Sequence, residues 1–209
     1  MKKILGLTIA VIMLMALVGG GTYAYFSDTE TSTGNTFTAG TLNLTVDAND
    51  GSNTVKFTVT NANPGQSGMG TWTLVNAGNL AGYIDLASIS VTSAENYNAA
   101  TNEAEASDDA DTSNATGVGE LAANLDVVLF IDDGAGAGTA NNGIKDGTEA
   151  TIYTGKLNAI AALYNQDLPL AAAGTTYISM TWSVASGVNN TIMGDSATLN
   201  MTFNLGQAV

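Results

Sequence analysis

The sequence contains no cysteine and no histidine. Without thiolate or imidazole, the chain lacks the softer ligands of zinc sites and the commonest general base. The zinc-protease motif HExxH cannot occur, and a serine triad would lack its usual base. GxSxG and P-loop motifs are absent as well, and aromatic residues make up only 7% of the chain, too few to favour a carbohydrate-cleaving cleft. These absences predict a protein that is not an enzyme.

Positive charge is also scarce. The chain has 5 lysines, no arginine and 19 acidic residues, a formal net charge of 5 − 19 = −14. Without residues 1–24, which carry Lys2 and Lys3, the remaining charge is 3 − 19 = −16. No basic patch is available to displace counterions from phosphates, so nucleic-acid binding is excluded. The acidic surface either serves solubility alone or makes the protein responsive to cations.

A long apolar run occurs only at the N-terminus. Lys2 and Lys3 precede an apolar stretch over residues 4–18, and small residues follow up to Ala24. This layout is typical of a secretory signal peptide over residues 1–24, removed by a signal peptidase after Ala24 or Tyr25. The protein would then be secreted and would contact the membrane only before cleavage. The alternative is a retained anchor from Ile4 to Phe26 with its aromatic residues at the interface.

The segment that follows the leader is polar and rich in threonine and serine. Tyr25 and Phe26 are its only large apolar residues. β-Branched threonines favour an extended strand, yet no alternating apolar face would bury it in its own sheet. We therefore expect a free terminus or a strand that pairs with another chain, joined by a linker that ends at residue 40. The candidate donor residues are Tyr25, Phe26, Ser27, Asp28, Thr29, Glu30, Thr31, Ser32, Thr33 and Gly34.

Residues 19–44, GGGTYAYFSDTETSTGNTFTAGTLNL, carry a resemblance to a known family. This stretch resembles the start of the TasA/camelysin family and of the related archaeal bundling-pilus subunits. The shared pattern is an apolar run, GGGT, a small-residue site that contains an aromatic residue, FSD and then FTAGTL. Residues 63–65 and 74–78 support the match more weakly. The resemblance implies a jelly-roll domain that polymerises into extracellular fibres, in which the N-terminal segment of one subunit completes the sheet of the next.

Alternating apolar residues predict an all-β domain over residues 41–209. Strands are expected at residues 41–47, 54–60, 70–75, 81–91, 124–131, 150–154, 175–184 and 197–205. We expect the first two to pair as a hairpin, residues 92–119 to form a surface insertion, and residues 157–163 to form a short helix that Pro169 ends. Short strands separated by Gly- and Asn-rich turns predict an antiparallel two-sheet sandwich, of which the jelly roll is one variant.

A Gly-rich loop after the apolar run at residues 127–131 is a candidate calcium site. Calcium takes six to eight oxygen ligands, and this loop spaces acids and amides through flexible turns. The candidate ligands are Asp132, Asp133, Asn141, Asp146 and Glu149. The spacing does not meet the EF-hand pattern, and an acidic hairpin turn is the alternative. No other cofactor is predicted.

Four N-x-T sequons are candidate glycosylation sites if the host modifies exported proteins: Asn43, Asn114, Asn189 and Asn200. Two classes of function remain. The first is a structural subunit that forms a homopolymer, a pilus or biofilm-matrix fibre at the cell surface. The second is a monomeric or membrane-tethered β-domain that binds a partner or a carbohydrate.

Overall fold

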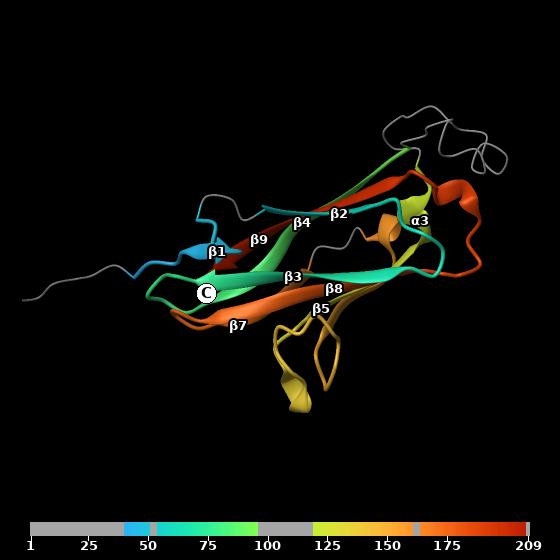
Figure 1. Ribbon diagram of the computed structural model, residues 1–209. Helices are drawn as coiled ribbons and strands as arrows, with labels where there is room; N and C mark the ends of the chain where they lie inside the picture. Colours follow the sequence, from blue (N-terminus) through green and yellow to red (C-terminus); the bar gives the residue numbers. More distant parts are fainter. Residues whose placement is uncertain (1–39, 51–53, 96–118, 161–163, 208–209) are drawn as a thin grey trace, which may run out of the picture. The chain divides into compact units, whose positions relative to one another are not determined.

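The computed structural model describes residues 40–50, 54–95, 119–160 and 164–207 (Figure 1). The predicted leader, the candidate donor residues 25–34 and Asn114 lie outside these residues. The described strands are β1 (Leu44–Val46), β2 (Thr54–Thr60), β3 (Ser67–Asn76), β4 (Gly82–Ala94), β5 (Leu125–Ile131), β6 (Thr151–Lys156), β7 (Tyr164–Leu170), β8 (Thr175–Val184) and β9 (Ser196–Gly206). The short helix α3 spans Leu121–Asn124, and no helix among the described residues is long and apolar enough to cross a bilayer.

The strands form two antiparallel sheets. One sheet has the order β1-β3-β8-β5-β6 and the other the order β2-β9-β4-β7. Without β1, the orders 3-8-5-6 and 2-9-4-7 are those of the two four-stranded sheets of a jelly roll. The predicted all-β sandwich is therefore confirmed, and β1 is a ninth strand added beside β3 (Figure 1).

The expected hairpin between the first two strands is wrong. β1 pairs with β3, and β2 pairs with β9 in the opposite sheet. Asp47 and Ala48 have φ values of 51° and 63°, and the Asn49 amide donates back to the Val46 carbonyl at 2.9 Å. This tight turn ends β1 after three residues, so the chain crosses to the other sheet instead of returning along β1.

The helix expected at residues 157–163 does not form over residues 157–160, and residues 161–163 lie outside the described residues. Leu157–Ala159 form one 3₁₀ turn, and Ile160 is already extended, with φ −74° and ψ 91°. Leu157 and Ile160 are both buried, and one 3₁₀ turn suffices to bring residues at this spacing to the same side. β7, which the alternation did not predict, follows and pairs with β4.

The core lies between the two sheets and is built from every second residue of the strands. Its largest fully buried side chains include Leu74, Ile84, Leu129, Met180 and Phe203. The ring of Trp72 on β3 and the ring of Phe57 on β2 pack edge to face, with their centroids 6.0 Å apart. A Cβ on Gly70 would lie 2.8 Å from the Phe57 ring, so glycine is needed there for the two sheets to approach.

Residues 133–150 fold across the outer face of the first sheet. Phe130, Asp132 and Ser179 are each 0% exposed, although strand alternation places them opposite the core. The amides of Asn142 and Gly143 donate to Asp132 beneath them. The loop therefore buries a second, smaller set of side chains and fixes the position of the predicted calcium ligands.

Candidate functional site

Asp132 is the central acid of the predicted calcium loop. Its carboxylate accepts hydrogen bonds from the Gly143 amide at 2.8 Å, the Asn142 amide at 3.3 Å and the Ser179 hydroxyl at 2.7 Å. Both oxygens therefore have donors from the protein itself. Such a carboxylate fixes the loop to β8 and does not depend on a metal to offset its burial.

The other acids of the loop are held in the same way. Glu149 is 2% exposed and accepts the amides of Gly134 and Asp146, each at 3.0 Å. Asp146 accepts the Thr139 amide at 3.1 Å, and exposed Asp133 accepts the amide of Ala135, also at 3.1 Å.

Asn141 is exposed in a left-handed conformation with φ 59°, and its amide donates to the Asp132 carbonyl. The loop thus brings the five predicted residues into one structure, in which backbone amides occupy carboxylate oxygens. Calcium binding there remains a prediction.

A second group of acids lies at the far end of the sandwich. Glu95 follows β4, Glu120 precedes α3, and Asp195 precedes β9. Oxygens of the three carboxylates lie within 4.8 Å of one another. Glu95 is 1% exposed and Asp195 0%, and Asp195 accepts the Leu121 amide at 2.8 Å. In the described part of the chain, this is the group of acidic side chains close enough to share a cation.

The arrangement has a simple electrostatic consequence. Burial and mutual repulsion both disfavour three charged carboxylates so close together, and a bound cation would offset both effects. Oxygen donors from three separate elements suit a hard cation such as Ca²⁺, which tolerates irregular geometry. A buried acidic cluster that could hold a metal is therefore present at this end.

Sequence reasoning missed this carboxylate cluster. Glu95 and Glu120 flank the insertion at residues 96–118, so nothing in the local sequence places them together. The register pairs Ala94 with Ser196, which sets Glu95 beside Asp195. The available signal was an acid a few residues after one predicted strand and another two residues before its partner, but using it required knowledge of which strands pair and where they end.

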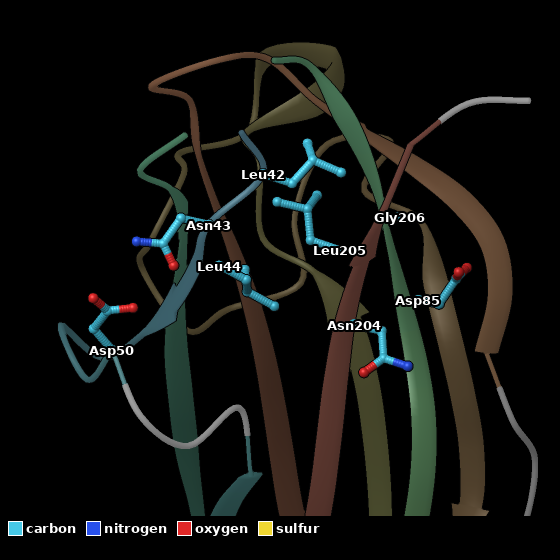
Figure 2. Close-up of a pocket in the computed structure, with 8 residues that line it drawn as sticks. All are labelled: Leu42, Asn43, Leu44, Asp50, Asp85, Asn204, Leu205 and Gly206. Atoms are coloured by element: carbon cyan, nitrogen blue, oxygen red, sulfur yellow. The ribbon is translucent and has the colours of Figure 1, made fainter. Parts of the chain in front are cut away.

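A cavity of about 640 Å³ opens between β1 and the end of β9. Figure 2 shows the side chains of Leu42 and Leu205 close together, with Asp50 and Asp85 on opposite sides. These two acids are not paired as the general acid and base of a hydrolase would be. The lining of the cavity is mostly polar, and Leu42, Leu44 and Leu205 are its apolar residues.

The sequence profile of the family described as "Camelysin metallo-endopeptidase" matches residues 1–208 of the chain. The chain belongs to the camelysin family. No curated protein matches the sequence. The resemblance of residues 19–44 is thereby confirmed, and camelysin membership supports a secreted protein of the fibre- or matrix-forming type.

The camelysin description implies a metal, and the residues can be tested against it. A catalytic zinc commonly has histidine or cysteine among its protein ligands, and the whole sequence has neither. The donors available at the carboxylate cluster are oxygens only. They do not fit the zinc site of a peptidase, although they fit a hard cation, so no hydrolytic step follows from this site.

The remaining predicted sites lie apart from both acidic groups. Asn189 is exposed in the turn before β9, and the Thr191 hydroxyl of its sequon donates to its side chain at 2.8 Å. Asn43 lines the cavity beside β1, and Asn200 lies within β9. Glycosylation of these residues remains a prediction, as does strand donation by residues 25–34.

Proposed function

We propose that this protein is a secreted structural subunit that polymerises into a fibre of the pilus or biofilm-matrix type at the cell surface. Assembly follows export: the signal peptidase removes residues 1–24, and Tyr25–Gly34 then adds as a strand to the sheet of a neighbouring copy. Membership of the camelysin family supports the general class, and the composition of residues 25–34 supports the mechanism.

The observation that carries the proposal is the self-sufficiency of the sandwich. Its buried core is continuous and draws its apolar side chains from Leu44 to Phe203. The eight strands of the jelly roll are all present after residue 53. The domain therefore does not require Tyr25–Gly34 for its own core, and that segment is available to a second chain.

Strand addition explains how such a domain becomes a polymer. An edge strand exposes a row of N–H and C=O groups that another extended segment can pair with. Each subunit gives one strand and receives one, so the contact is heterologous and propagates into a filament unless its rotation closes a ring. Peptidase activity is not part of the proposal, because the acids at the carboxylate cluster do not fit a catalytic zinc.

Deletion of Tyr25–Gly34 tests this function. Using protein that begins at Tyr25, as checked by N-terminal sequencing, we expect the deletion variant to keep its thermal unfolding transition and to form no fibres in electron micrographs. A matched control replaces the ten residues by a Gly/Ser segment of equal length and should also remain monomeric. Fibres of normal length from either variant would overturn strand donation by residues 25–34 and leave lateral packing or a separate scaffold as the route to assembly. Absence of fibres from the protein that begins at Tyr25 would favour a monomeric surface domain.

A further inference from the structure

We propose that the strand donated by a second copy is accepted by one particular edge, the Ser67–Trp72 half of β3. This inference rests on the proposed function and assigns the acceptor side of the same contact. The chemistry of recognition is backbone pairing with β3, together with apolar contact to Met69 and Ile144. The donor is Tyr25–Gly34 of the neighbouring chain.

The first observation is an incomplete edge. β3 has ten residues and pairs with β8 from Ser67 to Val75, while β1 covers only Leu74–Asn76 on its other side. Thr73 exchanges two hydrogen bonds with Asp47, each of 2.8 Å, where β1 turns away. Among the described strands, Ser67–Trp72 thus has a neighbour on one side only.

The backbone groups of this half-strand point to the open side in a regular way. Val75 and Thr73 direct their N–H and C=O groups toward β1 and Asp47. These groups alternate along an antiparallel strand, so those of Thr71 and Met69 point to the same side. An added strand can therefore take two further pairs of hydrogen bonds in line with β1.

The other edges in the described sheets carry features that discourage pairing. β2 contains Lys56, β6 ends with Lys156, and β7 contains Pro169, which has no N–H to donate. Two of the three lysines beyond residue 24 are thus on edge strands. β1, the terminal strand of its sheet, has only three residues, and the backbone of Val46 is already bonded to Asn49. Ser67–Trp72 has neither charge nor proline, and it is the longer of the unprotected edges in the described sandwich.

Exposed apolar side chains lie at the same place. Met69 is 57% exposed and Ile144 60% exposed, and they are the large apolar side chains left exposed among the described residues. Both line a groove of about 590 Å³ on the outer face of β3, β8 and β5. The Met69 thioether lies where a Cβ of Gly143 would sit, and Gly143 has φ 71°, so the loop is shaped to receive Met69.

The acceptor is held rigid from below. The Thr71 hydroxyl lies 2.8 Å from the Ser179 hydroxyl, which donates its proton to Asp132. Thr71 therefore donates to Ser179, and the open half of β3 is tied through β8 to the buried acid of the loop. An edge fixed in this way loses little further freedom when a strand binds.

The position of the edge identifies a second copy as its occupant. The chain enters the fold at the Asn76 end of β3, where the Thr41 amide donates to the Asn79 side chain at 2.6 Å. Ser67–Trp72 lies at the opposite end, and β1 with its turn at Asp47 lies between the two. A donor leaving one end and an acceptor at the other give a head-to-tail contact, which a filament requires.

The donor segment matches this edge in length and composition. Ten extended residues span about 33 Å, and the six residues of the open edge about 20 Å. The donor has only two large apolar side chains, Tyr25 and Phe26, and the edge offers one apolar pair, Met69 and Ile144. Asp28 and Glu30 would find no acid on Ser67–Trp72 itself, and Asp126 is the acid that lines the adjoining groove.

Disulfide mapping in the cysteine-free chain tests the assignment. We introduce Met69→Cys together with one cysteine at each position from Phe26 to Thr31 in turn, and oxidise the fibres mildly. A disulfide forms only where Cα atoms approach within about 7 Å, so donor register is read directly. We expect a ladder of covalent oligomers on a non-reducing gel for two or three of the donor positions. Thr151→Cys on the edge strand β6 is the matched control and should give none.

The outcomes separate this inference from the proposed function. Fibres that cross-link through Thr151→Cys, or through neither position, overturn the β3 assignment and leave strand donation standing. A cross-linked monomer overturns the second copy as occupant. Failure of the wild-type protein to form fibres at all overturns the proposed function itself.

A substitution gives a second readout. Met69→Lys places a charge on the open edge, and fibres should therefore be lost. Because the position is exposed, the melting temperature should stay within about 2 °C of wild type, as for an ordinary surface substitution. Thr151→Lys should retain fibres. Normal fibres from Met69→Lys would contradict the proposal.

Discussion

Asp132 connects more of the molecule than any other polar residue described above. It receives hydrogen bonds from two loop amides and from Ser179 of β8, and it does so at 0% exposure. Its sequence position, directly after an apolar run and before a Gly-rich loop, suggested a metal ligand. The structure gives it a role that needs no metal, because the donors that satisfy it come from the chain. A residue type that suits calcium also suits a buried turn.

Replacement of Asp132 measures that role. Asp132→Ala leaves three donors under the loop without their acceptor, and hydrogen bonds to a charged group are worth about 1.5–3 kcal/mol each without being additive. We expect the free energy of unfolding to fall by about 3 kcal/mol in urea denaturation. Asp133→Ala, next to it but exposed and accepting one amide, should cost less than about 1 kcal/mol. Equal losses for the two variants would contradict the structural role.

The elements were predictable to different degrees. Alternation located β2 and β8 to the residue, at 54–60 and 175–184, because each has one buried face. Strand partners were not predictable, since β2 pairs with β9 across more than 130 residues, whereas strands adjacent in sequence favour a hairpin. β7 was missed because Pro169 and a polar first half hide its pattern. The carboxylate cluster was missed for the same reason as the partners: it exists only through the β4–β9 register.

Glu95, Glu120 and Asp195 meet at the ends of three elements, and we expect this cluster to make the domain sensitive to cations. We expect Ca²⁺ at a hundredfold excess over its Kd to add about 2.7 kcal/mol, raising the melting temperature by about 5–10 °C for a domain of this size. Glu95→Gln should remove this response, because it takes one charged oxygen ligand away from the cluster.

Asp146→Asn is the control for this experiment, because Asp146 belongs to the other candidate site, the Asp132–Glu149 loop. It should keep the calcium response, since the loop acids already accept protein donors. A response lost only in Asp146→Asn would assign calcium to the loop. Melting curves of wild type that coincide in Ca²⁺ and in chelator would exclude both sites.

At the scale of the whole molecule, charge should oppose the proposed assembly. Beyond residue 24 the chain carries 3 − 19 = −16, so each added subunit would bring like charge to the fibre. Backbone pairing at an edge acts over a few ångströms, whereas this repulsion acts over the Debye length. Ionic strength should therefore control how often subunits meet, with little effect on the domain's own fold.

Fibre growth measured by light scattering should show this dependence. Raising salt from about 0.01 M to 0.15 M shortens the Debye length from about 30 Å to about 8 Å, and we expect growth to accelerate severalfold. Sucrose at equal osmolarity should leave the rate nearly unchanged. Slower growth in salt would indicate that opposite charges, which are scarce in this chain, dominate the contact.

The long register of β3 with β8 has a mechanical consequence. Nine residue pairs join these strands, and antiparallel hydrogen bonds lie perpendicular to the strand axis. If a neighbour's strand lies along β3, tension in the fibre runs parallel to β3 and loads those bonds in shear, all at once. Pulling at right angles would instead break them one after another. A fibre assembled on this edge would resist stretching far better than peeling. Under increasing tension, it should rupture at the donated strand before the sandwich unravels.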